Sequence, residues 1–173
     1  EAAGNLFTAF AIGGLTGGVF ANALGPSIVL HEQRSGNRHF PFMFRMVLYS
    51  SLILGLAVSA DSILKLPVLD WTGKSSFFWM AAGLSIIGGV IMVYAQRIRL
   101  RLLQHDEEHD VFGPDVMSNI LLIAAVPFTY WLLGIEAMSG LYLLSSLLAY
   151  IFYLSSKKNF AEQPLHPVDK KIR

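Results

Sequence analysis

The chain has no cysteine and few charged residues, and these two shortages limit what it can be. Without cysteine it has no disulfides, thiolate metal sites or cysteine nucleophiles. Charged residues make up 14% of its 173 residues, against about 25% in soluble globular chains, and hydrophobic residues make up 54%. A net charge of +1 gives no basic footprint for nucleic acid. This composition indicates a membrane protein.

The sequence also lacks the short motifs of common catalytic sites. It contains no G-x-x-x-x-G-K-[ST] phosphate loop, no G-x-G-x-x-G dinucleotide motif and no G-x-S-x-G serine elbow. No pair of carboxylates flanks a plausible catalytic pocket. We therefore expect neither an ATPase nor any bound cofactor.

What the sequence does contain is five long apolar stretches. About 20 apolar residues in a helix suffice to cross a hydrocarbon core about 30 Å thick. The expected spans cover residues 5–30, 45–65, 76–97, 116–134 and 137–156. The fold class is then an all-α polytopic bundle over residues 1–156, followed by a tail, residues 157–173. The alternative has four full spans, with the second stretch or the last hairpin re-entrant.

The basic residues predict an orientation for this bundle. Of the 13 Lys and Arg residues, all but Lys65 and Lys74 follow the first, third or fifth stretch. Cytoplasmic loops carry an excess of such residues, so we expect the N-terminus outside and the C-terminus in the cytoplasm. Compact chains with short loops are common in bacteria, and the expected location is a bacterial inner membrane.

The first span is rich in small residues at helical spacing. One row recurs at every fourth position and a second row lies beside it, and glycine on a shared face lets helices approach closely. The third span repeats the idea with Ala81, Ser85 and Gly89. These rows could pack against the chain's own helices, contact another subunit or line a substrate path, and the sequence does not decide between the three. The residues of the two rows are Gly13, Gly17, Ala21 and Gly25, and Gly14, Gly18 and Asn22.

Asp61 is the main ionisable candidate within a span. It stands four residues before Lys65 at the outer end of the second span, where an ion pair is sterically natural. We expect a solvated or paired interfacial carboxylate, and the alternative is a proton or ion site. Pro127 is expected to kink or end the fourth span.

The segment after the third span carries charges of both signs. Arg97, Arg99 and Arg101 precede Asp106, Glu107 and Glu108, so the helix is expected to protrude from the bilayer and stop before Gly113 and Pro114. This predicts a docking site for a cytoplasmic protein, and a solvated loop is the alternative. His105 and His109, four residues apart, are a weaker candidate for a metal site.

These features favour a non-enzymatic integral membrane subunit, a scaffold or assembly component of a multi-subunit translocation, secretion or transport complex. Its partners would be other membrane subunits, anionic lipid headgroups and cytoplasmic proteins. A second hypothesis is an autonomous small transporter or channel that acts as a homo-oligomer. A third is a membrane metalloenzyme that uses the histidines on the cytoplasmic side.

Overall fold

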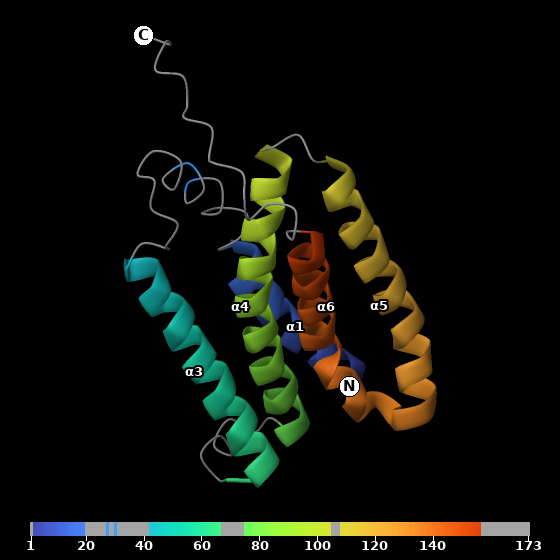
Figure 1. Cartoon of the computed structure of the whole chain (residues 1–173). Helices are drawn as coiled ribbons and strands as arrows, with labels where there is room; N and C mark the ends of the chain where they lie inside the picture. Colours follow the sequence, from blue (N-terminus) through green and yellow to red (C-terminus); the bar gives the residue numbers. More distant parts are fainter. Residues whose placement is uncertain are drawn as a thin grey trace, which may run out of the picture.

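The described part of the chain is almost entirely helical and contains no strand. The computed structural model describes residues 2–19, 27, 30, 42–66, 75–104 and 108–156. Its elements are α1 (Ala2–Val19), α3 (Phe42–Leu64), α4 (Ser76–Gln104), α5 (Glu108–Ala137), the short 3₁₀ helix η3 (Met138–Gly140) and α6 (Leu141–Ser156) (Figure 1). The expected all-α fold is confirmed.

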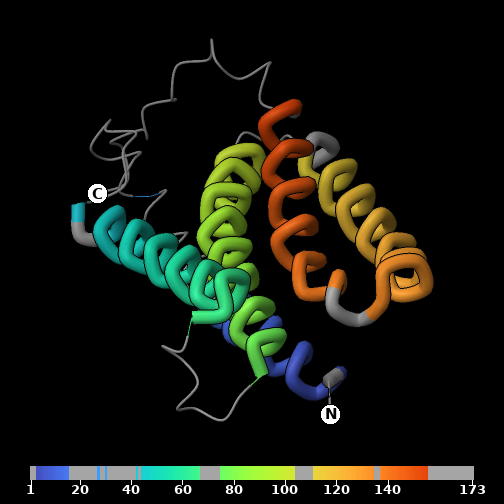
Figure 2. Tube along the Cα trace, turned by 90° about the horizontal axis from the view of Figure 1, so that it is seen from below, coloured from blue at the N-terminus to red at the C-terminus, as the bar shows by residue number. Residues whose placement is uncertain are grey.

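Helix α4 lies at the centre of the bundle. It packs against α1, α3 and α6, whereas α5 contacts mainly α6 (Figure 2). Within the apolar windows of these helices, 56% of the α4 window is buried, against 22% for α3, 28% for α6 and 6% for α5. The helix is therefore surrounded on three sides, and α5 stands at the edge.

Small residues let three helices approach α4 closely. A Cβ added to Gly83 would lie 2.8 Å from the backbone oxygen of Gly55 in α3. One added to Gly88 would lie 3.1 Å from Cα of Leu143 in α6. In a bilayer, tight packing of this kind replaces the hydrophobic effect as the force that associates helices.

On its third side, α4 packs against α1. A Cβ added to Gly13 would lie 2.5 Å from Cβ of Ser85. An apolar cluster below this contact joins Leu6 and Ala9 of α1 to Phe78, Ala81 and Ala82 of α4. Because residue numbers rise together along both helices, α1 runs parallel to α4.

Among the described residues, four helices are long and apolar enough to cross a membrane. They are Phe44–Leu64, Ser76–Leu103, Val111–Gly134 and Met138–Ser155, and they correspond to the expected second to fifth spans. The first expected span begins with α1, whose apolar helical part in the described residues, Ala3–Leu15, is shorter. The remainder of that span lies largely outside the described residues.

Two helix boundaries differ from the expectations. The helix that carries the arginines, α4, ends at Gln104 and so stops before Gly113 and Pro114 as expected, but these two residues do not break a helix, because α5 begins at Glu108 and continues through both. Pro127, which was expected to kink or end its span, does not end the helix, and the residue of α5 with non-helical dihedral angles is Gly134, with φ 77° and ψ −178°. A proline removes one backbone hydrogen bond, and a membrane helix can continue through that loss. Gly134, in contrast, has backbone dihedral angles outside the helical region.

The helices place four arginines at one end of the bundle. Helices α3 and α5 begin at this end and α4 and α6 finish there (Figure 1). Arg45 lies near the start of α3, and Arg97, Arg99 and Arg101 lie in the last turns of α4. Lys65 follows the other end of α3. We call the first of these ends the arginine end.

Candidate functional site

A polar cluster at the arginine end ties three helices together. Nε of Arg99 in α4 donates to Oδ2 of Asp115 in α5 at 3.1 Å. The hydroxyl of Tyr153 in α6 donates to the other carboxylate oxygen, Oδ1. Both oxygens of Asp115 are therefore occupied, and we call these three residues the Asp115 cluster.

The local sequence of α5 fixes the position of Asp115. Its backbone oxygen accepts hydrogen bonds from Nδ2 of Asn119 at 2.7 Å and from Oγ of Ser118 at 3.2 Å. One turn earlier, Val111 packs with Leu102 of α4 in an apolar cluster that also contains Tyr153. The carboxylate thus emerges at the edge of a packed apolar contact between the three helices.

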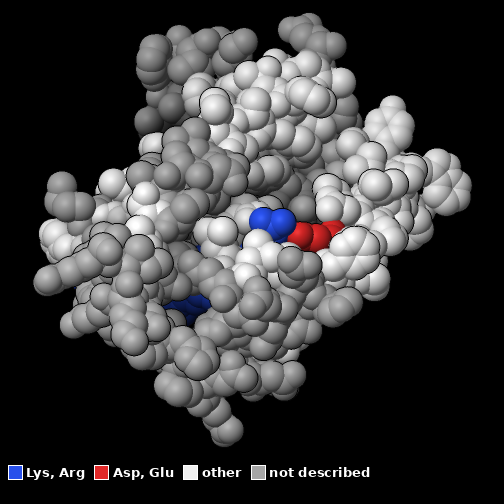
Figure 3. Space-filling model, turned by 90° about the horizontal axis from the view of Figure 1, so that it is seen from above, with Lys and Arg blue, Asp and Glu red and all other residues white. Residues whose placement is uncertain are grey.

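The Asp115 cluster is open to solvent on one side. The side chains of Arg99 and Asp115 are 34% and 37% exposed, while Tyr153 is 1% exposed. Figure 3 looks onto the arginine end and shows a basic and an acidic side chain in contact there. Because Arg99 and Tyr153 already engage the carboxylate, the arrangement suits a clamp between helices better than a general base presented to a substrate.

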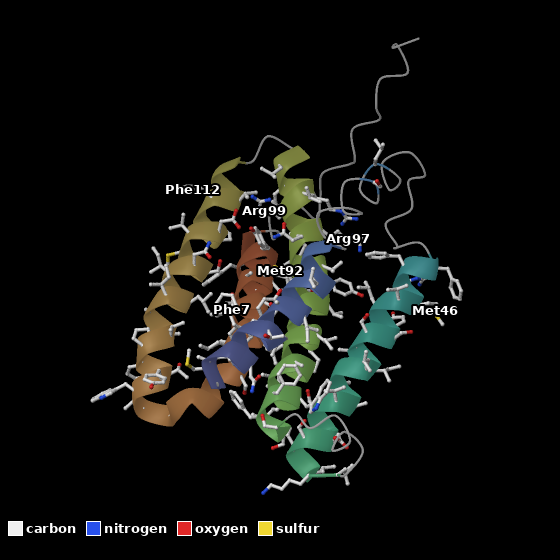
Figure 4. All side chains as sticks on the ribbon, turned by 180° about the vertical axis from the view of Figure 1, so that it is seen from behind. Phe7, Met46, Met92, Arg97, Arg99 and Phe112 are labelled. Atoms are coloured by element: carbon white, nitrogen blue, oxygen red, sulfur yellow. The ribbon has the colours of Figure 1, made fainter. Side chains whose placement is uncertain are left out.

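The three arginines of the predicted docking site do not all leave α4 on the same side. Figure 4 shows Arg97 leaving α4 on the side of α3 and Arg99 leaving it on the side of α5. Arg99 is part of the Asp115 cluster, and Nε of Arg97 is fully buried. Arg101, four residues after Arg97, shares the face of Arg97 and is half-buried.

The acidic residues of the predicted docking site and both histidines of the predicted metal site have side chains that the structure does not describe. His105, Asp106 and Glu107 lie outside the described residues. Glu108 and His109 belong to the first turn of α5, and their side chains are not described. Among the side chains that the structure describes, no three His, Cys, Asp or Glu residues form a group fit for a metal ion. The metal hypothesis stays a prediction.

Asp61 was expected to be solvated or paired at the interface, and its burial contradicts the solvated alternative. It is 9% exposed, and its Oδ1 is fully buried with no hydrogen-bond partner among the described residues. Lys65 has left the helix with φ 52° and is exposed. The backbone oxygen of Asp61 accepts a hydrogen bond from the N–H of Leu66 at 3.0 Å, at the C-terminal end of α3.

The two rows of small residues in the first span have different surroundings where they are described. Gly13 packs against α4, whereas a Cβ on Gly14 would meet nothing within 4 Å. Gly17 and Gly18 belong to the last turn of α1. Ala21, Asn22 and Gly25 lie outside the described residues.

Sequence reasoning missed Asp115 and Tyr153. One signal for the ion pair was present, because Arg99 and Asp115 stand equally far from residue 107, between the end of α4 and the start of α5. In an antiparallel helical hairpin, residues at equal distances from the turn face each other. Tyr153 had no comparable signal, since it comes from a third helix.

Comparison with protein-family models, curated proteins and solved structures finds no match for this chain.

Proposed function

We propose that this chain is a non-enzymatic integral membrane subunit that scaffolds a multi-subunit translocation, secretion or transport complex. The supporting observation is the exposure of α5. Only 6% of its apolar window is buried within the chain, although the other apolar helices are covered to a much larger extent. The exposed apolar residues include Ile120, Ile123, Phe128, Trp131 and Leu133.

The attachment of α5 supports an interface on its open side. The helix is held at the arginine end by Asp115 and at the other end by the turn through Gly134 into η3 and α6. Between these two anchors it leaves a long apolar surface, which in a bilayer is covered by lipid or by helices of a partner. A helix fixed at both ends and open along its side suits the seating of another subunit.

Matched substitutions on two exposed faces distinguish a partner from lipid. Ala124 of α5 and Ala57 of α3 are both exposed. A tryptophan facing lipid is tolerated, but one within a packed helix interface forces the helices apart. We expect the wild-type chain, purified in mild detergent from its native membrane, to carry partners in fixed proportion. Ala124→Trp should lose them and Ala57→Trp should keep them.

Other results would reject the scaffold function. A wild-type chain that elutes without membrane partners would contradict it. If Ala124→Trp and Ala57→Trp recovered partners equally well, the chain would still be a subunit of a complex, but α5 would not be its interface. Circular dichroism of both variants controls for folding.

The proposed orientation places the arginine end in the cytoplasm of a bacterial cell and the N-terminus outside. Arg45, Arg97, Arg99 and Arg101 lie at that end, and Lys65 follows the opposite end of α3. The positive-inside rule favours this arrangement. Because α1 runs parallel to α4, its N-terminus belongs to the end opposite the arginines.

Asp61 favours a second candidate function, an autonomous small transporter or channel. A carboxylate inside an apolar span with an unpartnered buried oxygen among the described residues is a common feature of proton and ion pathways. On this hypothesis, liposomes that contain the purified chain show a proton or cation flux that Asp61→Asn abolishes and Asp61→Glu partly restores. Absence of flux in the wild-type chain would end the hypothesis.

A further inference from the structure

One side of α3 changes from basic to aromatic to aliphatic residues along the helix. Arg45 begins it near the arginine end, Tyr49 follows one turn later, and Leu52 and Leu56 continue it toward the middle of the helix. Residues three or four positions apart share a helix face, so these four side chains form one stripe. Leu52 is half-buried and the other three are exposed. From Arg45 to Leu56 the helix rises about 16 Å, roughly half of the hydrocarbon core.

Helix α4 repeats this order. Read back from its C-terminal end, it presents Arg97, Tyr94, Ile91 and Ile87, again at spacings of three or four residues. Because α4 is antiparallel to α3, both stripes run from arginine through tyrosine to aliphatic residues in the same direction. An added Cβ on Gly55 of α3 would lie 2.9 Å from Cγ1 of Ile87, so the aliphatic end of the α4 stripe lies at the contact between the two helices.

The polar ends of the two stripes converge on Tyr94. This half-buried residue packs against an apolar cluster that joins Phe44 and Leu48 of α3 to Val90 and Val93 of α4, so it lies beside the first turns of the α3 stripe. Arg45 and Tyr49 of α3, Arg97 of α4 and Tyr150 of α6 are close enough to act on its hydroxyl. Two guanidinium groups and three phenol hydroxyls therefore share one neighbourhood. The side chain of Arg97 points to the α3 side of α4, as Figure 4 shows.

This combination matches the chemistry of a phospholipid at its headgroup. Guanidinium groups bind phosphate oxygens through paired N–H donors, and tyrosine hydroxyls add further donors. Basic pockets between membrane helices recognise anionic lipids, and tyrosines concentrate at the level of the headgroups. The aliphatic residues below supply an apolar surface whose length corresponds to one leaflet.

We propose that the arginines and tyrosines of these two stripes bind the phosphate of an anionic phospholipid, whose acyl chain lies along the aliphatic residues. The site is distinct from the Asp115 cluster, which uses Arg99 on another side of α4. The proposal does not depend on the scaffold function, because it needs no protein partner.

Native mass spectrometry of the full chain in mild detergent tests the proposal, with phosphatidylglycerol and phosphatidylcholine as probes. We expect phosphatidylglycerol to be retained and its affinity to fall about fivefold for each of Arg45→Gln and Arg97→Gln. Tyr94→Phe, which keeps the ring, should cause a smaller loss. Lys65→Gln is the matched control, because it removes an exposed positive charge at the opposite end of α3, and it should change nothing.

Three results would overturn the lipid site. The first is equal retention of the two lipids by the wild-type chain. The second is the same loss in Lys65→Gln as in Arg45→Gln, which would indicate a general charge effect. The third is displacement of phosphatidylglycerol by millimolar inorganic phosphate, which would indicate a site for free phosphate. Arg45 is exposed, so Arg45→Gln keeps the test available even where Arg97→Gln fails to fold.

Discussion

At the scale of single residues, the absence of side chains on a few glycines decides how closely the helices approach. Gly83→Ala should destabilise the chain by about 1–3 kcal/mol, because the new Cβ would meet the backbone oxygen of Gly55 and the backbone nitrogen of Ser59, each at 2.8 Å. Backbone atoms cannot rotate away, so α3 and α4 must separate. The free energy of unfolding in mild detergent measures this loss.

Gly14→Ala is the matched control for this substitution. Its added Cβ would meet nothing within 4 Å, and alanine favours a helix over glycine by up to about 1 kcal/mol. The variant should be as stable as the wild type or slightly more so. Equal destabilisation by Gly83→Ala and Gly14→Ala would show that close packing at Gly83 does not hold the two helices together.

Sequence spacing singled out only some of these packing residues. The rows that contain Gly13 and Ser85 repeat at every fourth position, and the structure brings these two residues together between α1 and α4. Gly83 and Gly88 escaped notice because they face different neighbours, α3 and α6. A central helix distributes its small residues over several faces, so no single periodic row reports all of its contacts.

At the scale of elements, the Asp115 cluster governs how α5 is held. Asp115→Ala leaves Arg99 without this partner and the buried hydroxyl of Tyr153 without an acceptor, at a cost of about 1–3 kcal/mol. We expect the N-terminal half of α5 to move away from α4. The chain has no cysteine, so spin labels at Leu103→Cys and Phe112→Cys are unique and report the separation.

The distance distribution between these labels should broaden in Asp115→Ala. Labels at Leu103→Cys and Met46→Cys, which join α4 to α3, are the control and should be unaffected. An unchanged distribution between α4 and α5 would mean that the apolar contact of Val111 with Leu102 is sufficient to hold the helix.

The same pair of helices shows why an element boundary was misjudged. The Gly113 and Pro114 pair has the composition of a helix break, and the sequence therefore predicted a helix end before it. The structure instead starts α5 at Glu108 and keeps both residues inside the helix. That shift moves Asp115 from a loop junction into a helical hairpin opposite Arg99, so the error in the boundary concealed the ion pair.

The turn between α5 and α6 depends on the backbone freedom of one glycine. Gly134 has φ 77°, in the left-handed region that side chains disfavour. Gly134→Ala should cost about 1–2 kcal/mol in the free energy of unfolding. Gly140→Ala is the control, since both positions have open space for a Cβ but only Gly134 has a positive φ. Equal losses of stability in the two variants would mean that the positive φ of Gly134 is not the cause of the destabilisation.

At the scale of the whole molecule, the sequence predicted the all-helical fold and four of the helices that are long and apolar enough to cross a membrane, because both follow from the length of the apolar stretches. It did not predict which helix would be central. That depends on small residues facing three neighbours at once, and hydropathy treats Gly83, Ser85 and Gly88 much as it treats any other part of a span. Nor did it predict the burial of Asp61, which hydropathy alone does not show.

The separation of charge along the molecule predicts which end faces the cytoplasm. Arg45 near the start of α3 and Lys65 directly after its end are 20 residues apart, a rise of about 30 Å in a helix, which matches the thickness of a hydrocarbon core. Single cysteines at Lys65 and Ser75, which are exposed at one end, should react with a membrane-impermeant maleimide in intact cells. A cysteine at Leu103, at the arginine end, should react only after permeabilisation, because the proposed orientation, which follows the positive-inside rule, puts that end in the cytoplasm. The reverse pattern would invert the orientation and move the proposed lipid site to the outer leaflet.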